Sequence, residues 1–210
     1  MKRSQRKGRF IVFEGIDGSG KTTQAQLLAA FLRKEGLEVV LTAEPTDLPS
    51  GKELRLALSG KQKKSECEMA ALFVLDRIAH NNDAKNGLRA LVENGAYVIC
   101  DRYYYSTLAY QGMSTDYAWV RSMNLSCPDI MKPDLCIYLD LTPKQSLERI
   151  RRGRESTEIY ETEEILTRVR DTFMNVIDDL KTTDNIAIVN AYRPADEIAV
   201  EICGLVKRIF

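Results

Sequence analysis

The stretch from Gly15 to Thr22 constrains the fold more than any other part of this sequence. It reads Gly-Ile-Asp-Gly-Ser-Gly-Lys-Thr and satisfies the pattern G-x-x-x-x-G-K-[ST] at every fixed position. A short β-rich run, Phe10–Phe13, precedes it, and a helical pattern begins at its last residue. The glycines allow backbone N–H groups to turn onto phosphate oxygens, and the helix N-terminus adds partial positive charge. The sequence therefore predicts a phosphate-binding loop (P-loop) for a nucleoside triphosphate.

Each residue of the P-loop is expected to contact the triphosphate or its metal ion. Lys21 can reach the β- and γ-phosphates, and the Thr22 hydroxyl can ligate Mg²⁺. We therefore predict Lys21 as a catalytic residue and Mg²⁺ as the cofactor. The predicted phosphate-binding residues are Gly15, Ile16, Asp17, Gly18, Ser19, Gly20, Lys21, Thr22 and Thr23.

Short β-rich runs alternate with helical patterns along the rest of the chain. The five predicted strands are Arg9–Glu14, Glu38–Thr42, Ala96–Cys100, Leu135–Asp140 and Ile186–Val189. The predicted helices, from apolar spacings of three and four, are Thr22–Lys34, Cys67–Glu93, Lys144–Arg152, Glu163–Lys181 and Ala195–Ile209. This alternation predicts an α/β fold with a parallel sheet flanked by helices.

Length and net charge limit the classes of protein to which this chain can belong. A chain of 210 residues is expected to form one domain, which we place at residues 9–210. The net charge is zero, so no global field recruits nucleic acid or an anionic membrane. The longest apolar run, Met69–Leu75, is far short of the ~20 residues that span a bilayer. Residues 1–8 are basic without an apolar stretch, so we expect a flexible tail, no signal peptide and a cytoplasmic protein.

The five cysteines include no C-x-x-C pair, and His80 is the only histidine. Zinc sites use paired spacings, so the sequence favours reduced, buried thiols and a packing or surface role for His80.

A P-loop alone leaves several classes of function open. A GTPase switch would carry N-K-x-D, which is absent, and a motor ATPase would be longer. A small kinase needs a second pocket with arginines for the phosphoryl acceptor. Asp101-Arg102 follows a strand at its carboxyl end and could hold Mg²⁺ and phosphate, or form an ordinary surface ion pair. Phe73 and Arg77 share a helix face and could bind a base, or be a core ring with an outward-reaching arginine.

The order of the motifs resembles that of bacterial thymidylate kinases, within the P-loop nucleoside monophosphate kinase family. The resemblance covers about residues 8–205 and rests on the segments 13–24, 42–45, 72–80, 101–112 and 132–140. It implies transfer of the γ-phosphoryl group of MgATP to dTMP, giving dTDP. It also implies a homodimer, and we expect the strand order 2-3-1-4-5.

The resemblance also implies roles for individual residues. Phe73 would stack on thymine, Arg77 would donate to its 4-carbonyl, and Tyr110 would exclude a 2′-hydroxyl. Arg102 would contact the dTMP phosphate and the transferred phosphoryl as a second catalytic residue. The predicted dTMP-binding residues are Asp17, Phe73, Arg77, Arg102, Ser106, Thr107, Tyr110 and Gln111, and the predicted metal ligands are Thr22 and Asp101.

Four arginines within Arg149–Arg154 match the family's lid, which we place at about residues 149–161. We expect this lid to be mobile and to close over ATP. Ile159 stands where the family usually carries the lid arginine, so we expect Arg154, or otherwise Arg152, to be catalytic.

Two further departures from the family's sequence pattern keep alternatives open. Ala43 replaces a usual arginine, which Arg55 on the following helix could supply, and Tyr104 and Tyr105 could alter the pocket rim. A kinase for another pyrimidine monophosphate, such as dUMP, is therefore one alternative. A non-catalytic ATP-binding module is another, although intact Lys21 and Arg102 argue against it.

Overall fold

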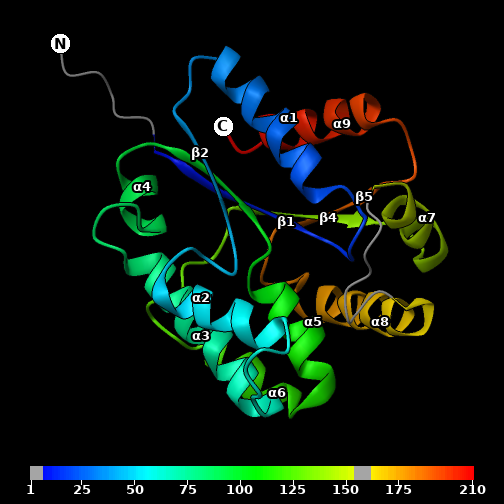
Figure 1. Cartoon of the computed structure of the whole chain (residues 1–210). Coiled ribbons are helices and arrows are strands. Elements are labelled where there is room, and N and C mark those ends of the chain that lie inside the picture. The colour runs from blue at the N-terminus through cyan, green and yellow to red at the C-terminus, as the bar shows by residue number, and fades with distance from the viewer. Residues whose placement is uncertain (1–6, 154–161) are drawn as a thin grey trace.

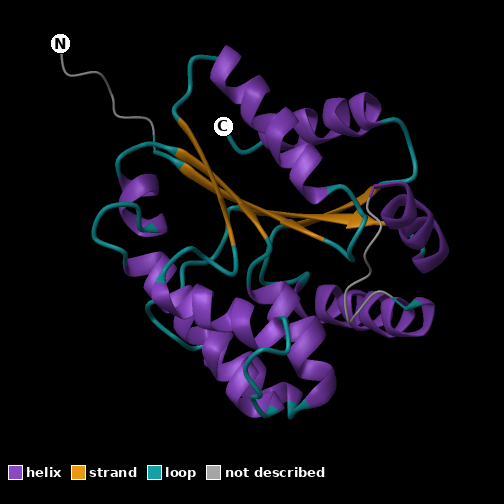
Figure 2. Ribbon diagram, in the orientation of Figure 1, coloured by secondary structure: helices purple, strands orange, loops and turns teal. Residues whose placement is uncertain are grey.

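Five parallel strands form the centre of the fold. In the computed structural model, which describes residues 7–153 and 162–210, they run in the order β2-β3-β1-β4-β5, as predicted (Figure 2). The strands are β1 Arg9–Glu14, β2 Val39–Ala43, β3 Tyr97–Asp101, β4 Leu135–Asp140 and β5 Ile186–Asn190. Each lies within about one residue of its predicted bounds. The carboxyl ends of β1 and β3 therefore meet at one edge of the sheet, in adjacent positions.

Helices cover both faces of the sheet (Figure 1). Helices α1 and α9 lie on one face, and α3, α4, α5, α6 and α8 lie on the other. The helices are α1 Lys21–Lys34, α2 Pro49–Leu58, α3 Glu66–Asn82, α4 Leu88–Glu93, α5 Tyr104–Ser114, α6 Tyr117–Leu125, α7 Pro143–Gly153, α8 Glu163–Leu180 and α9 Ala195–Lys207. Across the described residues, no helix has the length and apolar character to cross a membrane.

Strand β1 shows why both faces need covering. Phe10 and Val12 pack with the helices of one face, whereas Ile11 and Phe13 pack against α1 and α9 on the other. All four side chains are fully buried. This is the alternation that a strand with two buried faces requires, and it holds the P-loop on a rigid support.

The predicted helix Cys67–Glu93 is wrong in one respect, because the chain forms two helices there. The capping box of Ser65 and Glu68 starts α3, as its sequence signature indicates. The Asp83 carboxylate then accepts hydrogen bonds from the backbone N–H groups of Lys85 and Asn86. These bonds compete with continuation of the helix, so the chain turns before α4 begins.

Helices α5 and α6 were not predicted. Most of α5 is buried on all sides, so it lacks the apolar period of a surface helix. It also begins with tyrosine, serine and threonine, which have modest helix propensity. Packing against α6 and α8 therefore decides its conformation.

Tyr104 and Tyr105 lie in the core, which corrects the expectation that they shape the pocket rim. Both are 2% exposed. Their hydroxyl groups donate to one carboxylate oxygen of Asp184, over 2.5 and 2.7 Å. Lys132 pairs with the other oxygen at 2.8 Å. The two rings therefore fasten α5 to the loop between α8 and β5.

We expect Asp184→Asn to lower the free energy of unfolding at pH 7 by about 2–3 kcal/mol, because charged hydrogen bonds are lost. Burial raises the pKa of Asp184, but hydrogen bonds from Lys132, Tyr104 and Tyr105 outweigh burial and leave it below the ordinary 3.8. The ionised carboxylate thus stabilises the fold above about pH 4. Urea unfolding should show the difference between parent and variant shrinking as the pH falls below that value. Asp178→Asn, at an exposed carboxylate, is the control and should change stability by less than about 0.5 kcal/mol.

The five cysteines are free thiols, as predicted, but the expectation of burial is wrong for three of them, since Cys67 is exposed and Cys127 and Cys203 are half-buried. Cys100 and Cys136 lie in the core, where burial raises the pKa of each thiol well above its ordinary value. Both therefore pack as small apolar residues.

Candidate active site

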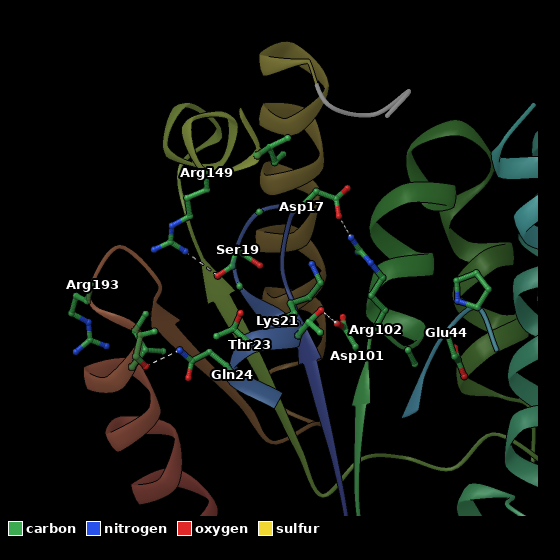
Figure 3. A pocket seen from close by; sticks show the side chains of 18 residues that line it. Asp17, Ser19, Lys21, Thr23, Gln24, Glu44, Asp101, Arg102, Arg149 and Arg193 are labelled. Atoms are coloured by element: carbon green, nitrogen blue, oxygen red, sulfur yellow. Dashed lines mark hydrogen bonds and ion pairs between the residues drawn. The ribbon is translucent and has the colours of Figure 1, made fainter. Parts of the chain in front are cut away.

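The P-loop connects β1 to α1 at the carboxyl edge of the sheet (Figure 3). Gly15 has φ 143°, and a Cβ there would lie 2.7 Å from the Leu139 carbonyl oxygen. Gly20, the N-cap of α1, has φ 95°. Side chains rarely adopt these angles, so both glycines are required for the loop to turn its N–H groups inward.

A cavity of about 730 Å³ opens over this loop, and we call it the P-loop pocket. Its size suits a nucleotide-sized ligand. Its lining residues are Asp17, Gly18, Ser19, Gly20, Lys21, Thr22, Thr23, Gln24, Ala43, Glu44, Pro45, Asp101, Arg102, Arg149, Ile150, Arg193, Ala195 and Ile198. Seven of the nine predicted phosphate-binding residues thus line the pocket, while Gly15 and Ile16 lie behind it.

The Lys21 ammonium group folds over the loop. Its Nζ donates to the carbonyl oxygens of Gly15 and Ile16, over 3.0 and 3.1 Å. Burial and the nearby Arg102 lower the pKa of Lys21 to about 8, against the opposing effect of three carboxylates. The ammonium group is therefore a partly desolvated cation, and its electrostatic attraction for an anion is strong.

Thr22 and Asp101 meet at the base of the P-loop pocket. The Thr22 hydroxyl donates to the Asp101 carboxylate over 2.7 Å, joining α1 to the end of β3. Hydroxyl and carboxylate oxygens are hard donors of the kind that Mg²⁺ prefers. The two predicted metal ligands are thus close enough to act together.

Arg102 stands between the P-loop and α5. One guanidinium nitrogen pairs with Asp17 at 2.5 Å, and another donates to the Ser106 hydroxyl over 3.0 Å. The guanidinium also faces the ring of Tyr110, 5.4 Å from its centroid. Arg102 has φ 70°, the one positive φ among the described non-glycine residues. Asp101 and Arg102 therefore do not form a surface ion pair with each other. Asp101 bonds to Thr22, and Arg102 bonds to Asp17 and Ser106.

A second cavity, of about 210 Å³, adjoins the first and is called here the Arg77 pocket. Its lining residues are Asp17, Glu44, Pro45, Leu58, Phe73, Arg77, Arg102, Tyr103, Ser106, Thr107, Tyr110 and Gln111. All eight predicted acceptor-binding residues are among them. Asp17, Glu44, Pro45 and Arg102 line both pockets, so the two cavities share a wall.

Arg77 is a buried cation, not an outward-reaching side chain. Its guanidinium is 1% exposed and pairs with the Glu44 carboxylate at 2.6 Å. It also donates to Asn124 and Thr107. His80, whose predicted packing role is confirmed, lies 3.0 Å from the second Glu44 oxygen. This network fixes the guanidinium in the pocket wall.

Sequence reasoning missed several of these residues. Glu44 and Asn124 hold Arg77 from 33 and 47 residues away in sequence. Glu44 lies in the motif segment 42–45 but was given no role, and no local pattern marks Asn124. Arg193, after β5, was also missed, although a basic residue beyond the carboxyl end of a strand is a usable signal.

Two further expectations need correction. Ala43 lines the P-loop pocket and is not among the residues of the Arg77 pocket. Arg55 donates to the Pro45 carbonyl oxygen and pairs with Asp47, and it lines neither cavity. It therefore braces the loop after β2 and does not replace the missing arginine at position 43.

The arginine cluster is described only in part. Arg149, on α7, donates to the carbonyl oxygens of Ser19 and Ala191 and so bridges the P-loop to the segment after β5. The predicted catalytic arginine Arg154 lies outside the described residues, and so does the side chain of Arg152. The catalytic role of either remains a prediction.

Comparison with known proteins identifies the family. A sequence model described as thymidylate kinase matches residues 13–202. A probable thymidylate kinase of Pyrococcus horikoshii is 40% identical over 208 residues, covering 96% of this chain and 97% of the relative. The chain belongs to the thymidylate kinase family.

Another member, the thymidylate kinase of Desulfotalea psychrophila, is 34% identical and covers 98% of both chains. A probable thymidylate kinase of Methanococcus aeolicus is 42% identical over 81% of this chain. The predicted family is thus confirmed, and the bacterial qualifier adds nothing to it. Membership makes the chain an ATP-dependent kinase, with the P-loop NTPase fold that thymidylate kinases share.

Proposed function

We propose that the chain phosphorylates dTMP to dTDP, with ATP in the P-loop pocket and dTMP in the Arg77 pocket. One observation carries the assignment of the two substrates. Asp17 and Arg102 line both cavities, so a phosphate at the end of either ligand would reach the same guanidinium. In-line phosphoryl transfer needs donor and acceptor to meet in this way.

ATP binding relies on backbone and on one ammonium group. The N–H groups after Gly15 surround the β- and γ-phosphates, and α1 directs its positive end toward them. Lys21 exchanges its two carbonyl partners for phosphate oxygens, which are stronger acceptors. Arg193 and Ile198, at the far end of the pocket, would contact the nucleoside part.

Thr22 and Asp101 are suited to hold Mg²⁺, Thr22 directly and Asp101 directly or through water. Mg²⁺ commonly keeps only one or two protein ligands beside phosphates and waters, so this pair is sufficient. The bound ion would neutralise charge on the β- and γ-phosphates.

Arg102 holds the acceptor phosphate against the γ-phosphoryl group. Its contacts with Asp17 and Ser106 leave the guanidinium fixed before substrate arrives. A fixed cation at the point where charge develops lowers the barrier without reorganising during the reaction.

The Arg77 pocket selects the base. Phe73 offers a ring face for stacking, and the Arg77 guanidinium offers N–H donors for a ring carbonyl. Donors at this position favour the 4-carbonyl of thymine over the 4-amino group of cytosine. Tyr110, beside Arg102, narrows the sugar side of the pocket against a 2′-hydroxyl.

We also propose the remaining family features for this chain. These are a homodimer in the cytoplasm that uses no nucleic acid, and a lid at about residues 149–161. The tail predicted at residues 1–8 lies outside the described residues as far as residue 6, and Gly8 is buried, with its N–H donating to the Val92 carbonyl oxygen over 3.2 Å. Ala43, Tyr104 and Tyr105 do not line the Arg77 pocket, so these residues give no reason to expect dUMP as the preferred acceptor.

A coupled assay of ADP release with dTMP, dUMP, dCMP, dGMP and UMP tests the proposed function. We expect the highest kcat/KM with dTMP. A higher kcat/KM with another acceptor, or ATP turnover that no monophosphate stimulates, would contradict the proposal.

Arg77→Ala is expected to weaken dTMP binding by roughly 10- to 150-fold, the value of one lost charged hydrogen bond. Calorimetry with dTMP and with an ATP analogue measures both affinities. Because Arg77→Ala leaves the buried Glu44 carboxylate without its arginine partner, Arg77→Lys serves as a matched variant that keeps the charge. An equal loss of ATP affinity in both variants would mean that Arg77 is structural.

A further inference from the structure

Glu14 is a fully buried carboxylate at the end of β1, directly before the P-loop. It lines neither the P-loop pocket nor the Arg77 pocket. One oxygen accepts from the backbone N–H groups of Tyr103 and Ser106, over 2.8 and 3.1 Å. The other accepts from the Ser106 hydroxyl over 2.6 Å. A buried charge with three donors and no place in the pockets requires an explanation.

Part of that explanation is the start of α5. Its N-cap residue, Tyr103, makes no side-chain cap hydrogen bond. Glu14 accepts hydrogen bonds from two N–H groups at the start of this helix, those of the N-cap Tyr103 and of Ser106, from 89 and 92 residues away in sequence. A carboxylate is also favourable at the positive end of a helix. Glu14 therefore caps α5 from the neighbouring strand.

The Ser106 hydroxyl extends this arrangement to Arg102. Because its proton is directed to Glu14, its oxygen lone pair is free to accept from the Arg102 guanidinium over 3.0 Å. Asp17 holds another nitrogen of the same guanidinium. Arg102 is thus fixed by two acceptors, one on the P-loop and one oriented by Glu14.

Donors surround the Glu14 carboxylate. Burial raises the pKa of Glu14 above its ordinary value, and Arg102, Ser106, Tyr103 and Lys21 offset only part of that rise. All three hydrogen bonds to the side chain come from donors, which is the pattern that an ionised carboxylate accepts.

We propose that Glu14 is a positioning residue for phosphoryl transfer, which acts through Ser106 to hold the Arg102 guanidinium at the junction of the two pockets. This inference rests on the role of Arg102 in the proposed function. Glu14 touches no substrate, so its effect on the reaction passes through Arg102.

Glu14→Gln separates this role from helix capping. The glutamine carbonyl oxygen can still accept from both N–H groups, but its amide group donates toward Ser106 and competes with Arg102. We expect kcat to fall about tenfold or more, as for a lost charged hydrogen bond. The affinity for an ATP analogue should change by less than about threefold, and the melting temperature by only a few degrees.

A double-mutant cycle with Arg102→Ala provides the decisive measurement. If Glu14 acts through Arg102, Glu14→Gln should lower kcat much less in the Arg102→Ala background than in the parent. Ser106→Ala should show the same coupling to Arg102→Ala. This second cycle tests the proposal if Glu14→Gln does not fold. Additive effects in both cycles, or an unchanged kcat in Glu14→Gln, would overturn the proposal. If Arg102→Ala itself leaves kcat unchanged, the assigned role of Arg102 in the proposed function has failed instead.

Discussion

Lys21→Ala should lower kcat by about 10²–10³-fold, the loss typical of removing one preorganised electrostatic donor. In the parent, the Lys21 ammonium group is held at the P-loop by two carbonyl oxygens and is already partly desolvated. Steady-state assay of ADP release at saturating ATP and dTMP measures the change.

The fold should survive this substitution, because the hydrogen bonds of the Lys21 ammonium group go to the backbone of the loop. Thermal unfolding should therefore give a melting temperature close to that of the parent. Lys34→Ala is the matched control, since Lys34 is exposed in the last turn of the same helix. Turnover above roughly a tenth of the parent rate would contradict the electrostatic role assigned to Lys21.

Arg102→Ala should lower kcat by about 10³-fold or more, at the lower end of the range for arginines that stabilise phosphoryl transfer. The guanidinium is the cation common to both pockets, so its loss affects the reacting phosphates directly. Arg102→Lys should recover only part of the lost kcat. The planar guanidinium bonds Asp17 and Ser106 through two separate nitrogens, and an ammonium group has only one.

Separate measurement of kcat and KM defines the role of Arg102. An interaction made mainly in the transition state lowers kcat more than it raises the KM for dTMP. Arg121→Ala, which removes a partly exposed pair with Asp179, is the control and should leave kcat unchanged. A fall in kcat of less than about tenfold in Arg102→Ala would assign the catalytic charge to another arginine.

The sheet and the P-loop could be predicted from the sequence because their signals are local. Each strand is a short apolar run between turn residues, and the phosphate-binding motif lies within eight consecutive residues. The Arg77 pocket was predicted by another route, since eight of its twelve lining residues were carried over from a family resemblance. Spacing alone left open whether Phe73 and Arg77 bind a base or are a core ring beside an outward-reaching arginine.

The features of the fold and of the site that were not predicted depend on contacts between residues far apart in the sequence. The sequence places Tyr104 and Tyr105 at the rim of the acceptor pocket. In the structure their hydroxyl groups donate to Asp184, about 80 residues away in sequence, and both rings lie in the core. Glu44 and Glu14 look like ordinary polar residues near strand ends. Their roles emerge only when the fold brings Arg77 and Ser106 beside them.

The backbone of Arg102 has a consequence for how this chain can change. Its φ of 70° lies in the left-handed region. Glycine adopts this region without strain, whereas a residue with a side chain is destabilised there by about 1 kcal/mol. The N–H of Arg102 donates to the Phe13 carbonyl oxygen over 2.9 Å, so the turn is fixed by the sheet. Glycine at this position would relieve the backbone strain, but it would also remove the guanidinium and its contacts with Asp17 and Ser106. A screen of variants of this kinase for heat resistance does not detect the loss of that cation, so any such screen must retain turnover as a second criterion.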